Sequence, residues 1–302
     1  MSEADTPSPG KMARALKELV RFRRRVEAAR YLGIPLLFRR RRRKALESRL
    51  RALWRGAYVE TAGDDLAFLP RELDFQAMRI LFGGFAAHPA ALAFLPAGGT
   101  ALDVGANLGE WTVPLARKAG AGGRVLAVEP NPAIAEALGR TLRINNLRQA
   151  EVLDIALSDR AGTATLALSA ASSGEARLAE PRTGERGIAV PTRRLDDLAA
   201  ERGLDRLDLV KIDVEGHERQ VLEGGAQTLA RFRPALVIES GHESADDRGA
   251  IAALMERLGY GLLAVLHDHG ALPATLADYR AARGACAGTE AHNLLLLPES
   301  GG

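Results

Sequence analysis

The residues best placed to bind a ligand follow two short apolar runs near the middle of the chain. The first run ends in Asp103-Val-Gly-Ala-Asn-Leu-Gly109, a stretch with two glycines and Asn107 between them. The second run, from Arg124 to Val128, is followed by Glu129. Glycine, and to a lesser extent asparagine, allows a left-handed backbone and a close approach to a ligand. A strand, a Gly-rich turn, a helix and a second strand ending in an acid are typical of the nucleotide-binding half of a doubly wound α/β fold.

The side chains around this turn favour one cofactor over dinucleotides. A dinucleotide fingerprint would repeat glycine where this chain has Asn107 and Glu110, and the Glu110 carboxylate would repel a pyrophosphate at the helix N-terminus. Asp103 suits a positively charged amino-acid group, and Glu129 is positioned to accept both ribose hydroxyls of an adenosine. S-adenosyl-L-methionine carries both groups, so it is the predicted cofactor. The residues expected to bind it here are Asp103, Gly105, Asn107, Gly109 and Glu129.

Three residues after the third expected strand, Asp154, Ile155 and Ala156, are expected beside the adenine of this cofactor. A simpler interpretation of Asp103 and Glu129 is that each acid caps a nearby helix. That interpretation leaves the Gly-rich turn and the spacing of the two acids unexplained.

A second concentration of polar residues follows the fourth expected strand. Leu209-Val-Lys-Ile-Asp213 leads into the turn Val214-Glu-Gly-His217. Ligands of a doubly wound sheet bind outside the carboxyl ends of its strands, so this turn should face the transferred methyl group and its acceptor. Methyl transfer to a hydroxyl needs close positioning of the acceptor and a base that removes its proton. The predicted catalytic residues are Asp213, His217 and Glu215, and whether His217 or Asp213 is the base stays open.

Structural roles for these acids also stay open. Glu215 and Glu218 could stabilise the first turn of the following helix, and Lys211 could pair with an acid in the core. Glu239, at the end of the fifth expected strand, is a further candidate on the acceptor side. We assign no metal ligands, although Asp213, Glu215 and Glu239 together could support metal-assisted O-methylation.

Two other methyl-transfer chemistries do not fit this turn. Methylation of exocyclic amines typically uses an Asn/Asp-Pro-Pro-aromatic motif, and here that position reads Asp213-Val-Glu-Gly216. Cytosine-C5 methylation needs a nucleophilic cysteine in a Pro-Cys turn, and Cys286 lies in Gly-Ala-Cys-Ala.

The basic character of the chain belongs to its N-terminal segment. Residues 1–55 hold 17 Lys/Arg against 5 Asp/Glu, and the other residues hold 24 against 33. Three interpretations stay open: a solvated extension, contact of residues 11–55 with an anionic membrane surface or lipid-like substrate, and nucleic-acid contact. The apolar run Leu36-Leu-Phe38 beside six basic residues favours the second over the third, because no aromatic-rich recognition module is evident.

The chain has one cysteine, and no secretory signal is evident at its polar N-terminus, so we expect a cytoplasmic protein, with a peripheral membrane contact as an alternative. The apolar region from Ile80 to Gly99 is broken by prolines and glycines and predicts a helix, a turn and a second short helix.

From about residue 100 the chain alternates strand and helix patterns, which predicts a doubly wound, mostly parallel α/β sheet. Strands are expected near 100–105, 124–129, 151–156, 207–213, 235–240, 260–266 and 292–298, and helices near 109–119, 132–145, 217–231 and 246–258. The insert from about 159 to 191 includes Thr163–Leu168, a candidate edge strand.

Four motifs in one order give the chain a family resemblance. Asp103–Gly109, Val128-Glu-Pro-Asn131, Lys211-Ile-Asp-Val-Glu-Gly-His-Glu218 and Pro234–Glu239 together resemble the FkbM family of S-adenosylmethionine-dependent methyltransferases. The similarity covers roughly residues 95–298, and the Lys-Ile-Asp-Val-Glu-Gly stretch is its specific part. The resemblance implies a Rossmann-like class I methyltransferase sheet of seven strands, with the last strand antiparallel.

The resemblance also implies O-methylation of a hydroxyl on a small molecule, sugar or glycolipid. Methylation of RNA or protein, and a non-catalytic cofactor-binding module, are the alternatives. We expect a basic, largely helical extension over residues 1–70 and a methyltransferase domain over residues 71–302.

Overall fold

The computed structural model describes residues 56–61, 65–70, 74–85, 87–169, 172–267, 270–287 and 292–299. The basic segment 1–55, with its expected helices and membrane contact, lies outside the described residues. The described part of the expected extension forms an antiparallel hairpin of β1 (Ala57–Glu60) and β2 (Leu66–Leu69). Two backbone N–H groups of β2, at Leu66 and Phe68, donate to side chains of the neighbouring helix, so the hairpin is docked on the body.

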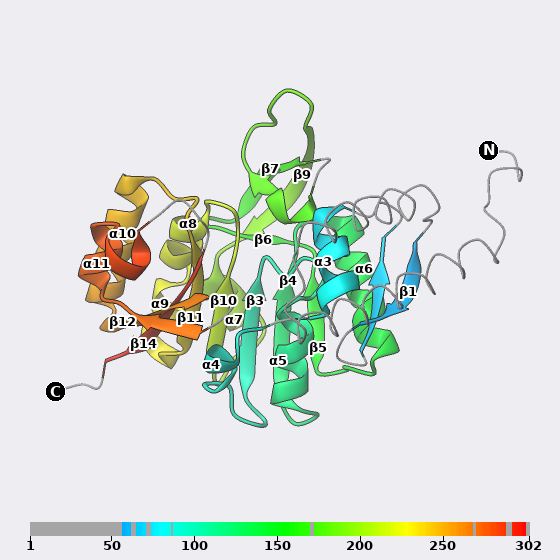
Figure 1. Ribbon diagram of the computed structural model, residues 1–302, viewed down its shortest axis with the longest axis horizontal. Coiled ribbons are helices and arrows are strands. Elements are labelled where there is room, and N and C mark those ends of the chain that lie inside the picture. The colour runs from blue at the N-terminus through cyan, green and yellow to red at the C-terminus, as the bar shows by residue number, and fades with distance from the viewer. Residues whose placement is uncertain are drawn as a thin grey trace, which may run out of the picture.

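The centre of the molecule is one twisted sheet of eight strands (Figure 1). In spatial order the strands are β13 (Gly270–Pro273), β12 (Tyr260–His267), β14 (His292–Pro298), β11 (Ala235–Ser240), β10 (Leu209–Ile212), β3 (Thr100–Val104), β4 (Arg124–Val128) and β5 (Ala150–Leu153). The five strands from β11 to β5 are parallel, and β14 runs antiparallel to both of its neighbours. This confirms the predicted seven-stranded sheet with an antiparallel last strand, and β13 adds an eighth strand at one edge.

Helices cover both faces of the sheet because both faces of its strands are apolar. On one face lie α4 (Pro89–Leu92), α5 (Thr112–Ala119) and α6 (Pro132–Ile144); on the other lie α7 (Leu195–Glu201), α8 (Glu218–Gly224), α9 (Ala226–Phe232), α10 (Ala245–Arg257) and α11 (Leu276–Arg280). Along β3, Leu102 and Val104 pack toward the second group of helices, and Ala101 packs toward the first. Asp103, two residues beyond Ala101, therefore faces α5.

Two predicted elements differ from those in the structure. The strand expected over 151–156 ends at Leu153, and β6 (Ala156–Leu157) joins a second sheet with the order β6-β9-β7-β8. The helix expected over 217–231 is broken at Gly225, where a Cβ atom would lie 2.7 Å from a Leu195 side-chain carbon. The other predicted strands and helices of the domain agree with the observed bounds to within three residues.

The small sheet stands above the carboxyl ends of the parallel strands (Figure 1). Its other strands are β7 (Gly162–Leu168), β8 (Arg177–Leu178) and β9 (Arg186–Arg193). Thr163–Leu168 is a strand, but its predicted edge position is wrong, because β7 lies between β9 and β8. Alternation of apolar and polar residues along a sequence indicates which segments are strands. It does not indicate which strands will pair.

The apolar region before β3 forms α3 (Phe75–Gly83), a turn and α4, as predicted. In the part of the chain that the structure describes, no helix is long and apolar enough to span a bilayer.

Candidate active site

A pocket opens at the carboxyl ends of β3, β4, β10 and β11, where the predicted site residues meet. Most of the predicted site residues line it: Asp103, Gly105, Asn107, Glu129, Ala156, Asp213, Glu215 and His217. Further lining residues come from α3, the turn before α5, the insert and the ends of β10 and β11, among them Gln76, Arg79, Trp111, Leu166, Ser173, Leu178, Lys211 and Glu239. The pocket therefore joins the two groups of residues that the sequence pattern singled out.

The Gly-rich turn has the left-handed backbone that its residue types predict. Gly105, Asn107 and Gly109 have φ values of 82°, 45° and 95°. A Cβ atom at Gly105 would lie 1.7 Å from the backbone oxygen of Asp213, so only glycine lets the ends of β3 and β10 approach this closely. Gly109 packs against Leu138 of α6 and is not among the residues that line the pocket.

Asp103 and Glu129 are buried in the pocket wall. Thr112 Oγ1 donates to Asp103 Oδ2 at 2.5 Å. The backbone N–H groups of Asn107 and Asn131 each donate at 2.8 Å to a different oxygen of Glu129. Burial raises the pKa of Asp103 to about 6 and that of Glu129 to about 7, and these hydrogen bonds offset part of the rise.

The small sheet supplies an apolar wall beside Glu129. Ala156, Leu157, Leu166 and Leu178 line this part of the pocket. Asp154 is exposed and Ile155 packs against the core, and neither of the two lines the pocket. Of the three residues predicted beside an adenine, only Ala156 therefore lines the pocket.

The exit of β10 carries an ion pair whose lysine is buried and whose aspartate is partly exposed. Lys211 Nζ lies 3.2 Å from Asp213 Oδ2 and 5.7 Å from the centre of the Trp111 ring, and the Lys211 side chain is 1% exposed. Burial by itself would raise the pKa of Asp213, but the Lys211 charge and a hydrogen bond with Glu239 outweigh it, so this pKa is lowered. The predicted pairing of Lys211 with an acid is confirmed, and Asp213 is a fixed negative charge.

Two glutamates beside this ion pair bind their protons more tightly than a glutamate in water does. Burial, with the Asp213 charge next in importance, raises the pKa of Glu239 to about 9 and that of Glu215 to about 8. Glu215 also has a positive φ of 54°, which is uncommon outside glycine.

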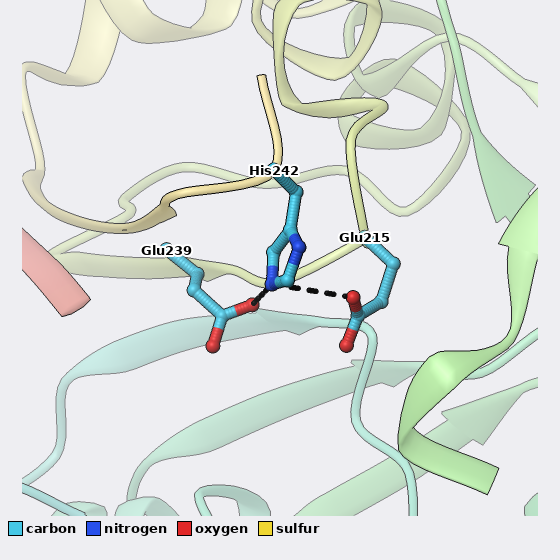
Figure 2. Close-up of side chains that lie close together, drawn as sticks. All are labelled: Glu215, Glu239 and His242. Atoms are coloured by element: carbon cyan, nitrogen blue, oxygen red, sulfur yellow. Dashed lines mark ion pairs between the residues drawn. The ribbon is translucent and has the colours of Figure 1, made fainter. Parts of the chain in front are cut away.

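His242, which the sequence analysis did not select, lies between these two glutamates (Figure 2). Its Nε2 is 3.4 Å from Glu215 Oε2 and 3.7 Å from Glu239 Oε2. The only signal in the sequence is that His242 comes three residues after Glu239, the acid near the end of β11. Its proximity to Glu215, from a different strand exit, follows from the tertiary structure.

His217 is anchored by the start of the insert. Its Nε2 lies 2.9 Å from Ser158 Oγ, which donates its own proton to Asp159 Oδ1. In that network His217 donates through Nε2–H, which leaves Nδ1 as the acceptor nitrogen. Burial lowers the pKa of His217, so its ring is neutral at pH 7.

Glu218 has a structural role in the same turn. Its Oε1 accepts the backbone N–H groups of Val214 at 3.1 Å and Gly216 at 3.2 Å. This buried carboxylate therefore fixes the shape of the turn that presents Glu215 and His217.

Helix α3 closes one side of the pocket. Gln76 and Arg79 donate to the two oxygens of Glu110 at 2.8 and 2.7 Å. Ser173, from the short helix η2 (Ser173–Glu175) of the insert, donates to the side chain of Asn107 at 3.2 Å. No local pattern marks Gln76, Arg79 or Ser173, because only the packing of distant segments brings them to the turn.

Comparison with known proteins agrees with this geometry. The family model for the methyltransferase FkbM domain matches residues 103–262. Methyltransferase sdnD of Sordaria araneosa is 30% identical over 208 residues, which cover 59% of this chain and 80% of that protein.

Two shorter similarities are to proteins named for specific reactions. The 2-O-methyltransferase NoeI of Sinorhizobium fredii is 38% identical over 71 residues, 24% of this chain and 29% of that protein. The 31-O-demethyl-FK506 methyltransferase FkbM of Streptomyces tacrolimicus is 31% identical over 135 residues, 45% of this chain and 44% of that protein. The similarity thus spans less than half the length of these two relatives. The family match covers more than half of the chain and includes both the Gly-rich turn and the acidic turn, so the chain belongs to the FkbM family of methyltransferases.

Proposed function

We propose that this protein transfers a methyl group from S-adenosyl-L-methionine to a hydroxyl of a small molecule, sugar or glycolipid. The observation that carries the proposal is one pocket in which the buried carboxylates Asp103 and Glu129 adjoin the acidic turn from Asp213 to His217. A cofactor site and an acceptor site need to share one space for a direct transfer.

The residues of the pocket fit this cofactor. Each oxygen of Glu129 accepts one backbone N–H and can accept a second donor, so both ribose hydroxyls could bind there. The apolar wall of the small sheet beside Glu129 suits an adenine. Asp103 would hold the amino group, with Gly105 and Asn107 providing close backbone approach.

The charge of the pocket also fits a cationic ligand. Six carboxyl groups line it, those of Asp103, Glu110, Glu129, Asp213, Glu215 and Glu239, against the cations Lys211 and Arg79. Glu215 and Glu239 hold their protons at neutral pH, and a cationic ligand would favour the ionised form of each carboxyl group. Negative charge in a partly closed pocket attracts a ligand that carries an ammonium and a sulfonium group.

The acceptor end contains groups that can position a hydroxyl and take its proton. S-adenosyl-L-methionine, when bound, supplies a methyl group on a positively charged sulfur, which keeps the electron pair of the broken bond. His217 Nδ1 is the acceptor nitrogen left by the Ser158 hydrogen bond, so we assign His217 as the base that takes the hydroxyl proton. Asp213, held ionised by Lys211, and Glu215 would orient the acceptor hydroxyl.

A hydroxyl is the acceptor that the relatives favour. The names of NoeI and of the Streptomyces FkbM protein both refer to methylated oxygens. We also propose that residues 71–302 form the catalytic unit, and that the basic residues 11–55 contact an anionic membrane surface on the cytoplasmic side.

Calorimetric titration with S-adenosylhomocysteine tests the cofactor assignment. We expect Asp103→Asn and Glu129→Gln each to weaken binding about ten- to a hundredfold, because each removes hydrogen bonds to a charged group. The matched control is Glu136→Gln, on the exposed surface of α6. Wild-type affinity in both pocket variants would contradict the assignment.

The acceptor class can be tested separately. Labelled cofactor is incubated with cell extracts that have been divided into small-molecule, lipid, glycan, RNA and protein fractions. We expect label in the small-molecule, lipid or glycan fraction, and label confined to RNA or protein would overturn the proposed acceptor.

A further inference from the structure

Glu215, Glu239 and His242 converge at the acceptor end of the pocket from three different positions in the fold (Figure 2). Glu215 lies in the turn after β10, Glu239 lies near the end of β11, and His242 lies in the loop after β11. One ligand-type atom of each lies within 4.8 Å of the other two. Two carboxylate oxygens and an imidazole nitrogen form a donor set that binds Mn²⁺, Fe²⁺ or Zn²⁺.

We propose that Glu215, Glu239 and His242 bind one divalent transition-metal cation beside the site of methyl transfer. This inference rests on the proposed function for its role in catalysis. The distances from His242 Nε2 to the two carboxylate oxygens are 3.4 and 3.7 Å. Ligand atoms around a tetrahedral Zn²⁺, with bonds of about 2.0 Å, are about 3.3 Å apart, so small side-chain adjustments would complete the site.

The charges around the three residues leave room for a cation. Lys211 is 3.2 Å from Asp213 and is hydrogen-bonded to a backbone oxygen. Among the described residues, no Lys or Arg side chain forms an ion pair with Glu215 or Glu239. Glu239 also shares a hydrogen bond with Asp213, which adds a further acid and no cation, so Glu215 and Glu239 have an unbalanced negative charge when they are ionised.

Glu239 provides a second, independent indication. Its Oε2 is a buried atom without a hydrogen-bond partner in the described part of the chain. The distance of 3.7 Å to His242 is too long for a hydrogen bond. A buried oxygen without a donor destabilises the fold, and a bound cation would satisfy it. A hydrogen bond between His242 and Glu239, the simplest alternative for this oxygen, is therefore not what the arrangement shows.

The position of the cluster determines what a cation could do. Glu215 and Glu239 both line the pocket, so a cation between them would border the space for the acceptor. A divalent cation with an open coordination position can bind an acceptor oxygen and make its proton easier to remove. The cation would also hold that oxygen in place for transfer.

Metal binding to the full-length, chelator-treated protein tests this site without any turnover. Mn²⁺ binding is measured from the electron paramagnetic resonance signal of the free ion, and Zn²⁺ binding by calorimetry. We expect one ion per chain, and we expect His242→Ala and Glu239→Gln to weaken binding at least about tenfold, since loss of even an outer-shell partner costs about that much. Glu136→Gln is the control and should bind as the wild type does.

Two results would overturn the inference: no stoichiometric binding of Mn²⁺ or Zn²⁺, or unchanged affinity in both variants. The His242 side chain is 42% exposed, so its replacement should leave the fold intact, and thermal melting of each variant checks this. Titration with S-adenosylhomocysteine in the same samples separates the two proposals. Cofactor binding without metal binding rejects only the metal site, and metal binding without cofactor binding rejects only the proposed cofactor.

Discussion

Asp103 and Glu129, which we propose as cofactor ligands, are acids that are difficult to ionise in their buried positions. The fold buries both carboxylates, which raises the pKa values to about 6 and about 7. Thr112 and the Lys211 charge oppose the rise at Asp103, while the charges of Asp213 and Glu110 add to it. Both acids therefore bind protons more tightly in the empty pocket than in water, and a cationic ligand favours the form that has lost the proton.

This electrostatic coupling predicts that cofactor affinity depends on pH. Ligand binding should lower the pKa of Asp103, so protons are released on binding and affinity increases as pH rises through about 6. Below that pH the affinity of the wild type should fall by up to about tenfold per pH unit for each proton released. Calorimetry in buffers of different ionisation enthalpy measures the number of protons.

Asp103→Asn provides the internal control for this prediction. The variant has no carboxylate to titrate at this position, so its affinity should be lower and should change less between pH 5 and pH 7. An equally steep pH dependence in the variant would assign the proton to another group.

At the scale of elements, the position of His217 depends on the contact between α8 and the exit of β6. A Cβ atom at Gly224 would lie 2.1 Å from the backbone oxygen of Ser158. The same serine holds His217, which precedes α8. Close approach of helix and strand at a glycine thus determines where the proposed base lies.

Gly224→Ala should separate α8 from the strand exit. Overpacking of this kind typically lowers the free energy of unfolding by about 1–3 kcal/mol. Methyl-transfer activity should fall as well, because Ser158 and His217 move apart. Urea unfolding and activity assays measure the two effects.

Gly249→Ala is the matched control on α10. No atom lies within 4 Å of the position that its Cβ would take. Alanine in place of glycine inside a helix should raise the free energy of unfolding by about 0.5–1 kcal/mol and leave activity unchanged. Similar effects of the two substitutions would show that contact with Ser158 is not the cause.

In the molecule as a whole, basic and acidic residues are distributed unevenly along the chain. Residues 1–55 contain 17 of the 41 Lys/Arg residues, and the remaining residues carry an excess of acid. In the sequence, the docked β1–β2 hairpin comes after this basic segment and before the large sheet. A basic segment would attract anionic lipid, while the acidic body would not.

Deletion of residues 1–55 should therefore abolish binding to vesicles that contain anionic lipid and leave S-adenosylhomocysteine affinity unchanged. Sedimentation with anionic vesicles at several salt concentrations measures the effect, and neutral phosphatidylcholine vesicles are the control. Vesicle binding that survives the deletion would contradict the proposed membrane contact. Salt-dependent binding to RNA that is lost with the segment would favour the nucleic-acid interpretation instead.

Much of the fold and part of the site could be predicted from local sequence. The apolar runs that end in Asp103, Glu129 and Asp213 defined three strands and the edge of the sheet where the pocket lies. Gly105 and Asn107 were recognisable because a left-handed turn restricts which residues fit. These features depend on periodicity and backbone conformation, which neighbouring residues largely determine.

The remaining features depended on contacts between distant segments. The sequence placed Asp154 and Ile155 at the pocket, but β6 leaves the main sheet there and contributes Ala156 and Leu157 instead. Pairing of β7 inside the small sheet was equally invisible, because alternation does not specify strand partners.

By itself, the sequence determined the class of fold, from its alternating strand and helix patterns, and the positions of the Gly-rich turn and the acidic turn, because each turn is encoded within a few consecutive residues. Only the tertiary structure decided which side chains meet. Ser158 meets His217 because α8 packs closely against the exit of β6. His242 meets Glu215 and Glu239 because the register of parallel strands brings the ends of β10 and β11 to one edge of the sheet. No local pattern in the chain records that register.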